Sequence, residues 1–274
     1  MKYFMSTINF APHMNEKISD VIPEMMKNGY NNIEISSFHP YEKDLYFKDY
    51  SANILLHNFA PSDGSDLLIN LCSKNSEKVK QFIKDRITLT RELGENYYSF
   101  HAGFRVDSLN PSKDDKRLDY RYAMDKFISE LEEIVKFADK EKIHIGVENH
   151  FCTREKKDDL LLYNIMDWDE LFSRIDSRYL HLHLDIGHLK IASNEFDFDH
   201  QEFLRRFGHK VMAVHVHDNT GWKIDCHAPI DNNFWFTEDN WRQLNNLEYV
   251  ILETRTMCDM NLINYMKEYI EDEV

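Results

Sequence analysis

The sequence predicts a single (β/α)8 (TIM) barrel that spans residues 1–274, and three observations support this fold class. Short apolar runs alternate with amphipathic stretches from one end of the chain to the other, which is the pattern of parallel strands joined by helices. Eight such runs occur, and eight strands close a barrel of this kind. The chain has 274 residues, of which 42% are hydrophobic, and about 250 residues is typical of one such domain.

The eight predicted strands are short, and most end in a polar side chain. Repeated strand–helix alternation implies right-handed crossovers, so we expect all eight strands to be parallel. The strands are predicted over residues 3–8, 32–36, 53–57, 97–101, 144–148, 181–185, 211–217 and 249–253.

The predicted helices lie between these strands, and the clearest are residues 76–93 and 119–140, where apolar residues recur at helical spacing. Gly29 and Gly94 each follow a predicted helix, as glycines do at helix C-termini. Residues 38–50 show no clear helical period, so the second strand–helix unit is the weakest. The remaining helices are expected over residues 16–28, 168–175, 199–207, 238–244 and 262–270.

Two long segments without helical pattern, residues 58–75 and 219–237, each follow a predicted strand. They are therefore expected at the C-terminal face of the barrel, where active sites of this fold are built. No stretch rich in proline, glycine or serine and no internal repeat marks a second domain.

Composition limits the classes of partner. The net charge of −15 counts against binding nucleic acid through its phosphates. No run approaches the roughly 18 apolar residues of a membrane span, and the first residues lack a long apolar segment with a cleavage site. The four cysteines are far apart and form no CxxC pair, which is typical of reduced thiols; they are Cys72, Cys152, Cys226 and Cys258. These features predict a soluble cytoplasmic protein and leave a homo-oligomer open.

Potential metal ligands gather at the C-terminal ends of the predicted strands. In HLHLDIGH, strand alternation turns His183 and Asp185 to the side opposite Leu182 and Leu184. The polar set should face the barrel axis, where charges are costly to bury unless they are paired or bind metal. Such a set suits Zn²⁺, Mn²⁺ or another first-row divalent ion. The nine candidate ligands are His57, His101, Glu148, Asp185, His188, His215, Asp225, His227 and Glu253.

These ligands divide into a central set and an outer set, which together predict one to three divalent ions. Four of them, Glu148, Asp185, His215 and Glu253, make a complete site for one ion. A metal-free polar interior is the alternative for this central set. For His57 and His101, which could hold a second ion with Glu148 bridging, the alternative is hydrogen bonding to substrate. For Asp225 and His227, which could hold a third ion with His188, the alternative is a solvated loop pair.

Seven motifs carry a family resemblance: LLHNFAP, YYSFHAGF, GVENH, LDIGH, VHVHDN, DCH and ILET, in this order over residues 54–254. The chain resembles the xylose-isomerase-like barrel superfamily, which contains sugar isomerases and epimerases as well as endonuclease IV. By that resemblance, the central four ligands match the single-metal site of the epimerases, and all nine match the trinuclear zinc pattern of the nuclease. His188 would contact substrate in the first case and metal in the second.

The sequence also departs from the family pattern. The Gly-rich segment expected after the DCH motif is replaced by APIDNNFWFTEDNW. The arginine that the epimerases carry after the seventh strand is absent from HDNTGW, although Lys223 is close by.

The first functional hypothesis is a metal-dependent isomerase or epimerase of a sugar or sugar derivative that works through a metal-stabilised enediolate. Its substrate would be a small sugar or sugar phosphate. Glu148 and Glu253 would move the proton, and His188 would orient a substrate hydroxyl. The inward-facing His217 also suits a role behind the metal ligands, and Trp222 could belong either to an apolar wall with Phe234, Trp235 and Phe236 or to ordinary loop packing. The predicted substrate-binding residues are Glu34, His217, Lys223 and Trp222.

The alternative is a multi-zinc phosphoesterase of the endonuclease IV type, which the number of ligands favours. The acidic charge disfavours a DNA substrate, because few cations lie near the predicted mouth; they are Arg105, Lys190, Lys223 and Arg255. A catalytically silent metal- or sugar-binding barrel is the third hypothesis.

Overall fold

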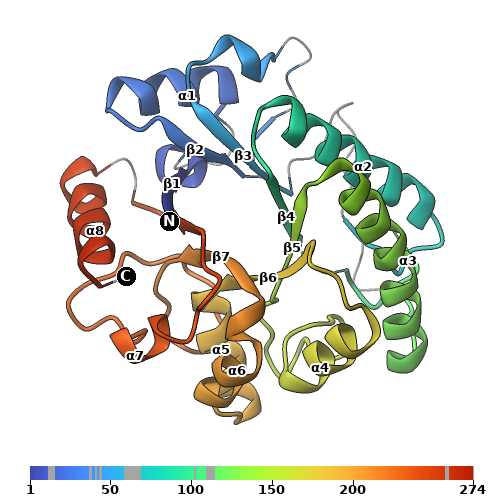
Figure 1. Cartoon of the computed structure of the whole chain (residues 1–274). Coiled ribbons are helices and arrows are strands. Elements are labelled where there is room, and N and C mark those ends of the chain that lie inside the picture. The colour runs from blue at the N-terminus through green and yellow to red at the C-terminus, as the bar shows by residue number, and fades with distance from the viewer. Residues whose placement is uncertain are drawn as a thin grey trace.

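The computed structural model describes residues 1–11, 16–36, 39–40, 42, 45–58, 69–101, 103–108, 115–256 and 259–273. Eight parallel strands close into one barrel in chain order, and β1 pairs with β8 (Figure 1). The predicted fold class is confirmed, and no strand end differs from its predicted position by more than two residues. The strands are β1 (Lys2–Ser6), β2 (Asn32–Ile35), β3 (Asn53–His57), β4 (Tyr97–His101), β5 (His144–Glu148), β6 (Leu180–Asp185), β7 (Val211–Val216) and β8 (Tyr249–Leu252).

Helices surround the barrel (Figure 1). Within the described ranges, three short 3-10 helices accompany them: η1 (Thr7–Phe10), η2 (Phe47–Asp49) and η3 (Gly208–Lys210). The helices are α1 (Ile18–Lys27), α2 (Ser76–Glu92), α3 (Tyr120–Glu141), α4 (Ile165–Arg174), α5 (Ile186–Phe196), α6 (His200–Phe207), α7 (Glu238–Trp241) and α8 (Met260–Glu273).

The structure confirms one expectation about the helices and departs from others; α7, for example, ends at Trp241, three residues before its predicted end. Within the described part of the segment between β2 and β3, η2 is the one helical element, in line with the missing helical period there. Conversely, α5 was not predicted, although it begins directly after the LD of LDIGH. None of the helices in the described ranges is both long enough and apolar enough to cross a membrane.

The strands sort their side chains to two sides of the barrel wall. On β8, Val250 and Leu252 belong to the large core between strands and helices, whereas Tyr249 and Ile251 belong to a smaller apolar cluster. Since Glu253 is two residues beyond Ile251, strand alternation places it on the same inward side. The barrel interior is therefore apolar below and polar at the C-terminal ends of the strands. This apolar floor supports the predicted ligands from beneath; it is formed by Phe4, Leu55, Tyr97, Met212, Ala213, Tyr249 and Ile251.

Candidate metal centre

All nine predicted ligands meet at the C-terminal end of the barrel, where they form three overlapping groups. In the first group, Nε2 of His57 lies 3.3 Å from Nε2 of His101 and 3.3 Å from Oε2 of Glu148. Nε2 of His101 lies 3.2 Å from Oε1 of the same carboxylate. Two ligands at about 2.0–2.2 Å from one tetrahedral ion stand about 3.3–3.6 Å apart, so this spacing fits donors to a common ion.

The central group is assembled around His215 of β7. Its Nδ1 lies 3.1 Å from Oε2 of Glu253, 3.5 Å from Oε2 of Glu148 and 3.8 Å from Oδ2 of Asp185. Both His215 and Asp185 are 0% exposed. Nδ1 of His215 and both carboxylate oxygens of Glu148 are buried and make no hydrogen bond to the described residues. Buried polar atoms that make no hydrogen bond are costly, and a cation shared among these three atoms would satisfy them.

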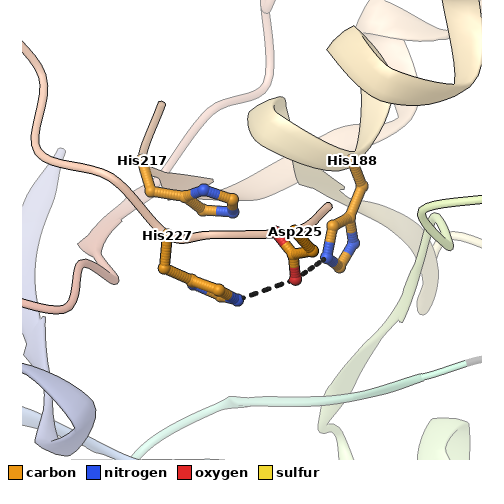
Figure 2. A group of neighbouring side chains, drawn as sticks. All are labelled: His188, His217, Asp225 and His227. Atoms are coloured by element: carbon orange, nitrogen blue, oxygen red, sulfur yellow. Dashed lines mark hydrogen bonds and ion pairs between the residues drawn. The ribbon is translucent and has the colours of Figure 1, made fainter. Parts of the chain in front are cut away.

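The third group stands nearer the surface, and Figure 2 shows it. Oδ2 of Asp225 lies 3.2 Å from Nε2 of His188 and 2.9 Å from Nε2 of His227. The ring of His217 stacks on that of His227, with centroids 4.1 Å apart and planes inclined by 20°. Ligand atoms of these four side chains lie within 4.8 Å of one another.

The three-residue spacing between Asp185 and His188 in the LDIGH motif is that of a helix N-cap and the residue whose N–H it accepts. Asp185 ends β6 and is the N-cap of α5, where its Oδ1 accepts a hydrogen bond from the backbone N–H of His188 at 2.6 Å. Capping fixes the carboxylate at the helix N-terminus, while Oδ2 stays directed at Nε2 of His217, 2.9 Å away. A Cβ at Gly187 would lie 2.1 Å from Cε1 of His217, so this turn requires glycine.

The loop after β7 is closed by a backbone bridge and carries the ligands Asp225 and His227. After β7 the chain leaves the barrel and comes back in an antiparallel bridge between Asp218 and Ala228, with both N–H···O=C distances 2.8 Å. The loop places Asp225 and His227 beside the strand ends. Nδ1 of His227 lies 3.0 Å from the backbone carbonyl oxygen of Glu253, which holds the imidazole against the end of β8.

Asn149 joins the ligands of two neighbouring strands. Its Oδ1 accepts from the N–H of Asp185 at 2.8 Å, and its Nδ2 donates to the carbonyl oxygen of Asp185 at 3.0 Å. Its own carbonyl oxygen lies 2.9 Å from Nδ1 of His188. One buried asparagine thus fixes the backbone at one ligand and the ring orientation of another, a supporting role that metal sites commonly need.

Two further asparagines act in the same way. Oδ1 of Asn58 accepts from the N–H of His101 at 2.9 Å, which ties the end of β3 to the end of β4. Nδ2 of Asn219 donates to Oδ1 of Asp225 at 3.1 Å. The sequence interpretation missed all three asparagines, although each directly follows a polar residue at or just beyond a strand end, in HN, EN and DN.

The carboxylates of the site create a negative potential that favours bound positive charge. Burial lowers the pKa of His188 and His215, but the neighbouring carboxylates together outweigh burial and hold both values well above their usual range. Asp185 and Asp225 act on His188, and Glu253 and Glu34 act on His215. Burial raises the pKa of Glu148, yet the neighbouring histidines hold it well below its usual range. The carboxylates therefore attract protons to the imidazoles, and a divalent cation bound to the same atoms would meet the same demand.

The residues present thus fit a divalent ion by donor chemistry, by spacing and by the unsatisfied atoms of Glu148 and His215. Glu34 supports this conclusion, because its Oε1 and Oε2 lie 3.0 and 3.1 Å from Nε2 of His215. A carboxylate behind an imidazole is the usual arrangement for orienting a histidine ligand.

The ligand groups open into a cavity of about 450 Å³. Phe104, Val106, Phe151 and Leu160 give its outer wall an apolar character, while Arg117, Lys156, Asp159 and Arg255 give it charge. The isolated bridges Phe104–Leu160 and Val106–Arg117 hold this wall together. The other lining residues are His57, His101, Glu148, His150, His188, Asp225, His227 and Glu253.

The structure places the predicted substrate-binding residues elsewhere than in this lining. Glu34 is 1% exposed and His217 is 0% exposed, and both contact ligands from behind. That position favours an orienting role over direct contact with a substrate. Trp222 and Lys223 are exposed on the loop after β7. Their roles toward a substrate stay predictions.

The aromatic residues after the DCH motif, for which an apolar wall and ordinary loop packing were both open, do not line this cavity. Phe234 and Phe236 are buried in the large core, and Trp235 packs against it, so packing accounts for these three aromatic residues. The apolar part of the cavity wall comes instead from the segments after β4 and β5, for which the sequence offered no periodic signal.

Comparisons with known proteins identify the family of the chain. The family model described as "Xylose isomerase-like TIM barrel" matches residues 23–271. An uncharacterised protein of Methanocaldococcus jannaschii, MJ1311, is 28% identical over 287 residues, which cover 99% of this chain and 90% of that protein.

Solved structures share the fold. A D-tagatose 3-epimerase-like protein superposes with a TM-score of 0.72 at 24% identity and covers 100% of this chain and 97% of its own. The IolI protein with a bound zinc atom superposes with a TM-score of 0.65 at 15% identity, covering 100% and 98%. The chain belongs to the xylose isomerase-like TIM barrel family.

Proposed function

We propose that the protein is a divalent-metal-dependent isomerase or epimerase of a sugar or sugar derivative. The observation that carries the proposal is the placement of Glu148 and Glu253. The two carboxylates come from β5 and from the end of β8, lie 3.5 and 3.1 Å from the same nitrogen of His215, and line one cavity. The likeness to a D-tagatose 3-epimerase-like protein supports this reaction class, and the zinc atom bound to the IolI protein supports a metal at the site.

The ion would be held by Glu148, Asp185, His215 and Glu253. When bound, a divalent cation supplies positive charge that stabilises the negative charge developing on two adjacent oxygens of the substrate.

The two glutamates would move the proton. One carboxylate takes the proton from the carbon next to the carbonyl group, and the electron pair of that C–H bond passes toward the carbonyl oxygen. The other carboxylate returns a proton to the carbon from the opposite face, which inverts its configuration. His188 lines the cavity with Nε2 3.2 Å from Asp225, so its ring is held where it can orient a substrate hydroxyl group.

Hydrogen exchange tests this proposal. Protein loaded with Mn²⁺ or Zn²⁺ is incubated in D₂O with a panel of ketoses and aldoses, and loss of the carbon-bound proton is followed by NMR. We expect exchange next to the carbonyl group of at least one sugar. Glu148→Gln should slow that exchange at least a hundredfold, since general acid–base groups contribute about 10²–10⁴-fold. The control is Glu155→Gln, an exposed carboxylate on the following loop. Exchange that continues unchanged in Glu148→Gln would rule out the mechanism.

The second candidate, a multi-zinc phosphoesterase, has one observation in its favour: all nine ligands converge, and the outer donors are spaced as well as the central ones. Elemental analysis of the purified protein separates the candidates. One tightly bound ion per chain supports the isomerase, whereas three ions together with zinc-dependent hydrolysis of a phosphoester, lost in Asp225→Ala, would replace it.

A further inference from the structure

The outer wall of the cavity carries positive charge, although the chain as a whole has a net charge of −15. Arg117, Lys156 and Arg255 line this wall, and we call these three side chains the rim. They come from three different segments, which follow β4, β5 and β8. Asp159 forms an ion pair with Arg117, so the rim and its paired carboxylate together have a net charge of +2.

The rim charges do not neutralise the carboxylates of the metal centre. Glu148, Asp225 and Glu253 have histidines as their partners. Among the described residues, no ion pair joins a carboxylate to Arg255 or Lys156. The ammonium group of Lys156 instead lies 4.5 Å above the ring of Phe151, a contact that holds the cation at the cavity without cancelling its charge.

Arg255 is tied to the reacting end of the cavity by the backbone. It follows Glu253 by two residues, and its N–H donates to the carbonyl oxygen of His227 at 2.9 Å. Glu253 and Arg255 both line the cavity, one at its base and one at its rim. A molecule bound in this cavity can therefore contact both the Glu253 carboxylate and the Arg255 side chain.

We infer that the substrate is a sugar that carries an anionic group, either a phosphate ester or a carboxylate, and that the rim binds this group. The inference rests on the proposed function, since it assigns the substrate class of the same cavity. Arginine presents paired N–H donors that match both kinds of anion. A volume of about 450 Å³ holds a small molecule, so a monosaccharide with one such group fits and a nucleic acid duplex does not.

Matched ligand pairs test the rim. Binding to the metal-loaded protein is measured by calorimetry for D-ribulose 5-phosphate against D-ribulose, and for D-gluconate against D-glucitol. We expect at least one anionic member to bind tenfold or more tightly than its neutral partner, and the pair in which this occurs tells phosphate from carboxylate. Arg255→Gln and Lys156→Gln should each reduce that ratio severalfold, and the double variant should bring it close to one.

The control is Lys157→Gln, which removes a neighbouring exposed lysine that does not line the cavity and should leave the ratio unchanged. Equal affinities within both pairs, or a preference that survives the double substitution, would overturn the inference. Because calorimetry needs no turnover, anion binding through the rim without any hydrogen exchange would preserve the inference and refute the proposed reaction. Hydrogen exchange in neutral sugars that is unchanged by the rim substitutions would support the proposed reaction and overturn the inference about the rim.

Discussion

The base of the cavity and its rim are built by different parts of the fold. The base consists of the four central ligands, Glu148, Asp185, His215 and Glu253, which stand at the ends of strands and are at most 4% exposed. Hydrogen bonds from neighbouring segments hold Asp185, His215 and the backbone of Glu253. The rim side chains stand on connecting segments, and Lys156 and Arg255 are exposed. In this barrel the strands fix what chemistry can occur, and the connections select what molecule enters. Substitutions in the two regions should therefore change different measured quantities.

Among these substitutions, Asp185→Asn at the base should have the largest effect, which is the loss of stabilisation by bound Zn²⁺. The substitution keeps the shape of the side chain but removes the negative charge of one of the four ligands that would hold the ion. In the wild type, Zn²⁺ at about 100 times its dissociation constant should add about 2.7 kcal/mol to the free energy of unfolding. Thermal unfolding with and without Zn²⁺ should show that stabilisation in the wild type and little of it in the variant. Asp176→Asn, an exposed aspartate, is the control. Equal stabilisation of Asp185→Asn would mean that the ion binds elsewhere.

A smaller loss of metal affinity is expected from Glu34→Gln, because Glu34 contacts a ligand and not the ion itself. Glu34 does not line the cavity, and its carboxylate faces Nε2 of His215. Loss of such a supporting partner typically costs about 10–100-fold in metal affinity, and chelator competition measures this loss. The exposed Glu132→Gln should leave the affinity unchanged. If Glu34 instead contacted substrate, metal affinity would be preserved and the Michaelis constant would rise.

The ligands on strands could be predicted from the sequence, because successive side chains of a strand point to opposite sides, a pattern that repeats every two residues. A polar residue that ends an apolar run, such as Glu148 or Asp185, must face the barrel axis if its aliphatic neighbours face the helices. The same logic located β3, β4 and β5 with the bounds that the structure shows. Once eight strand ends share one face, the convergence of the ligands follows from closure of the barrel.

Features borne by the connections could not be predicted in this way. Arg117 reaches the cavity through a bridge with Val106, and Lys156 through contact with the ring of Phe151, and neither contact leaves a periodic pattern. The helix α5 was missed for a different reason. Its N-cap, Asp185, was interpreted as a metal ligand alone, whereas one oxygen caps the helix and the other faces the site.

The smallest effect is expected at the rim, where Arg255→Gln and Lys156→Gln should leave both the metal affinity and the unfolding midpoint nearly unchanged. Both side chains are exposed, and surface substitutions away from special features usually change the free energy of unfolding by no more than about 0.5 kcal/mol. Chemical denaturation and chelator competition check the two quantities on the same samples. A rim substitution that released the ion would show that the two regions are coupled, because a charge outside the ligand groups would then be part of what holds the metal. If both quantities stay constant while anion preference falls, base and rim act separately, and substrate preference can be changed without disturbing the metal centre.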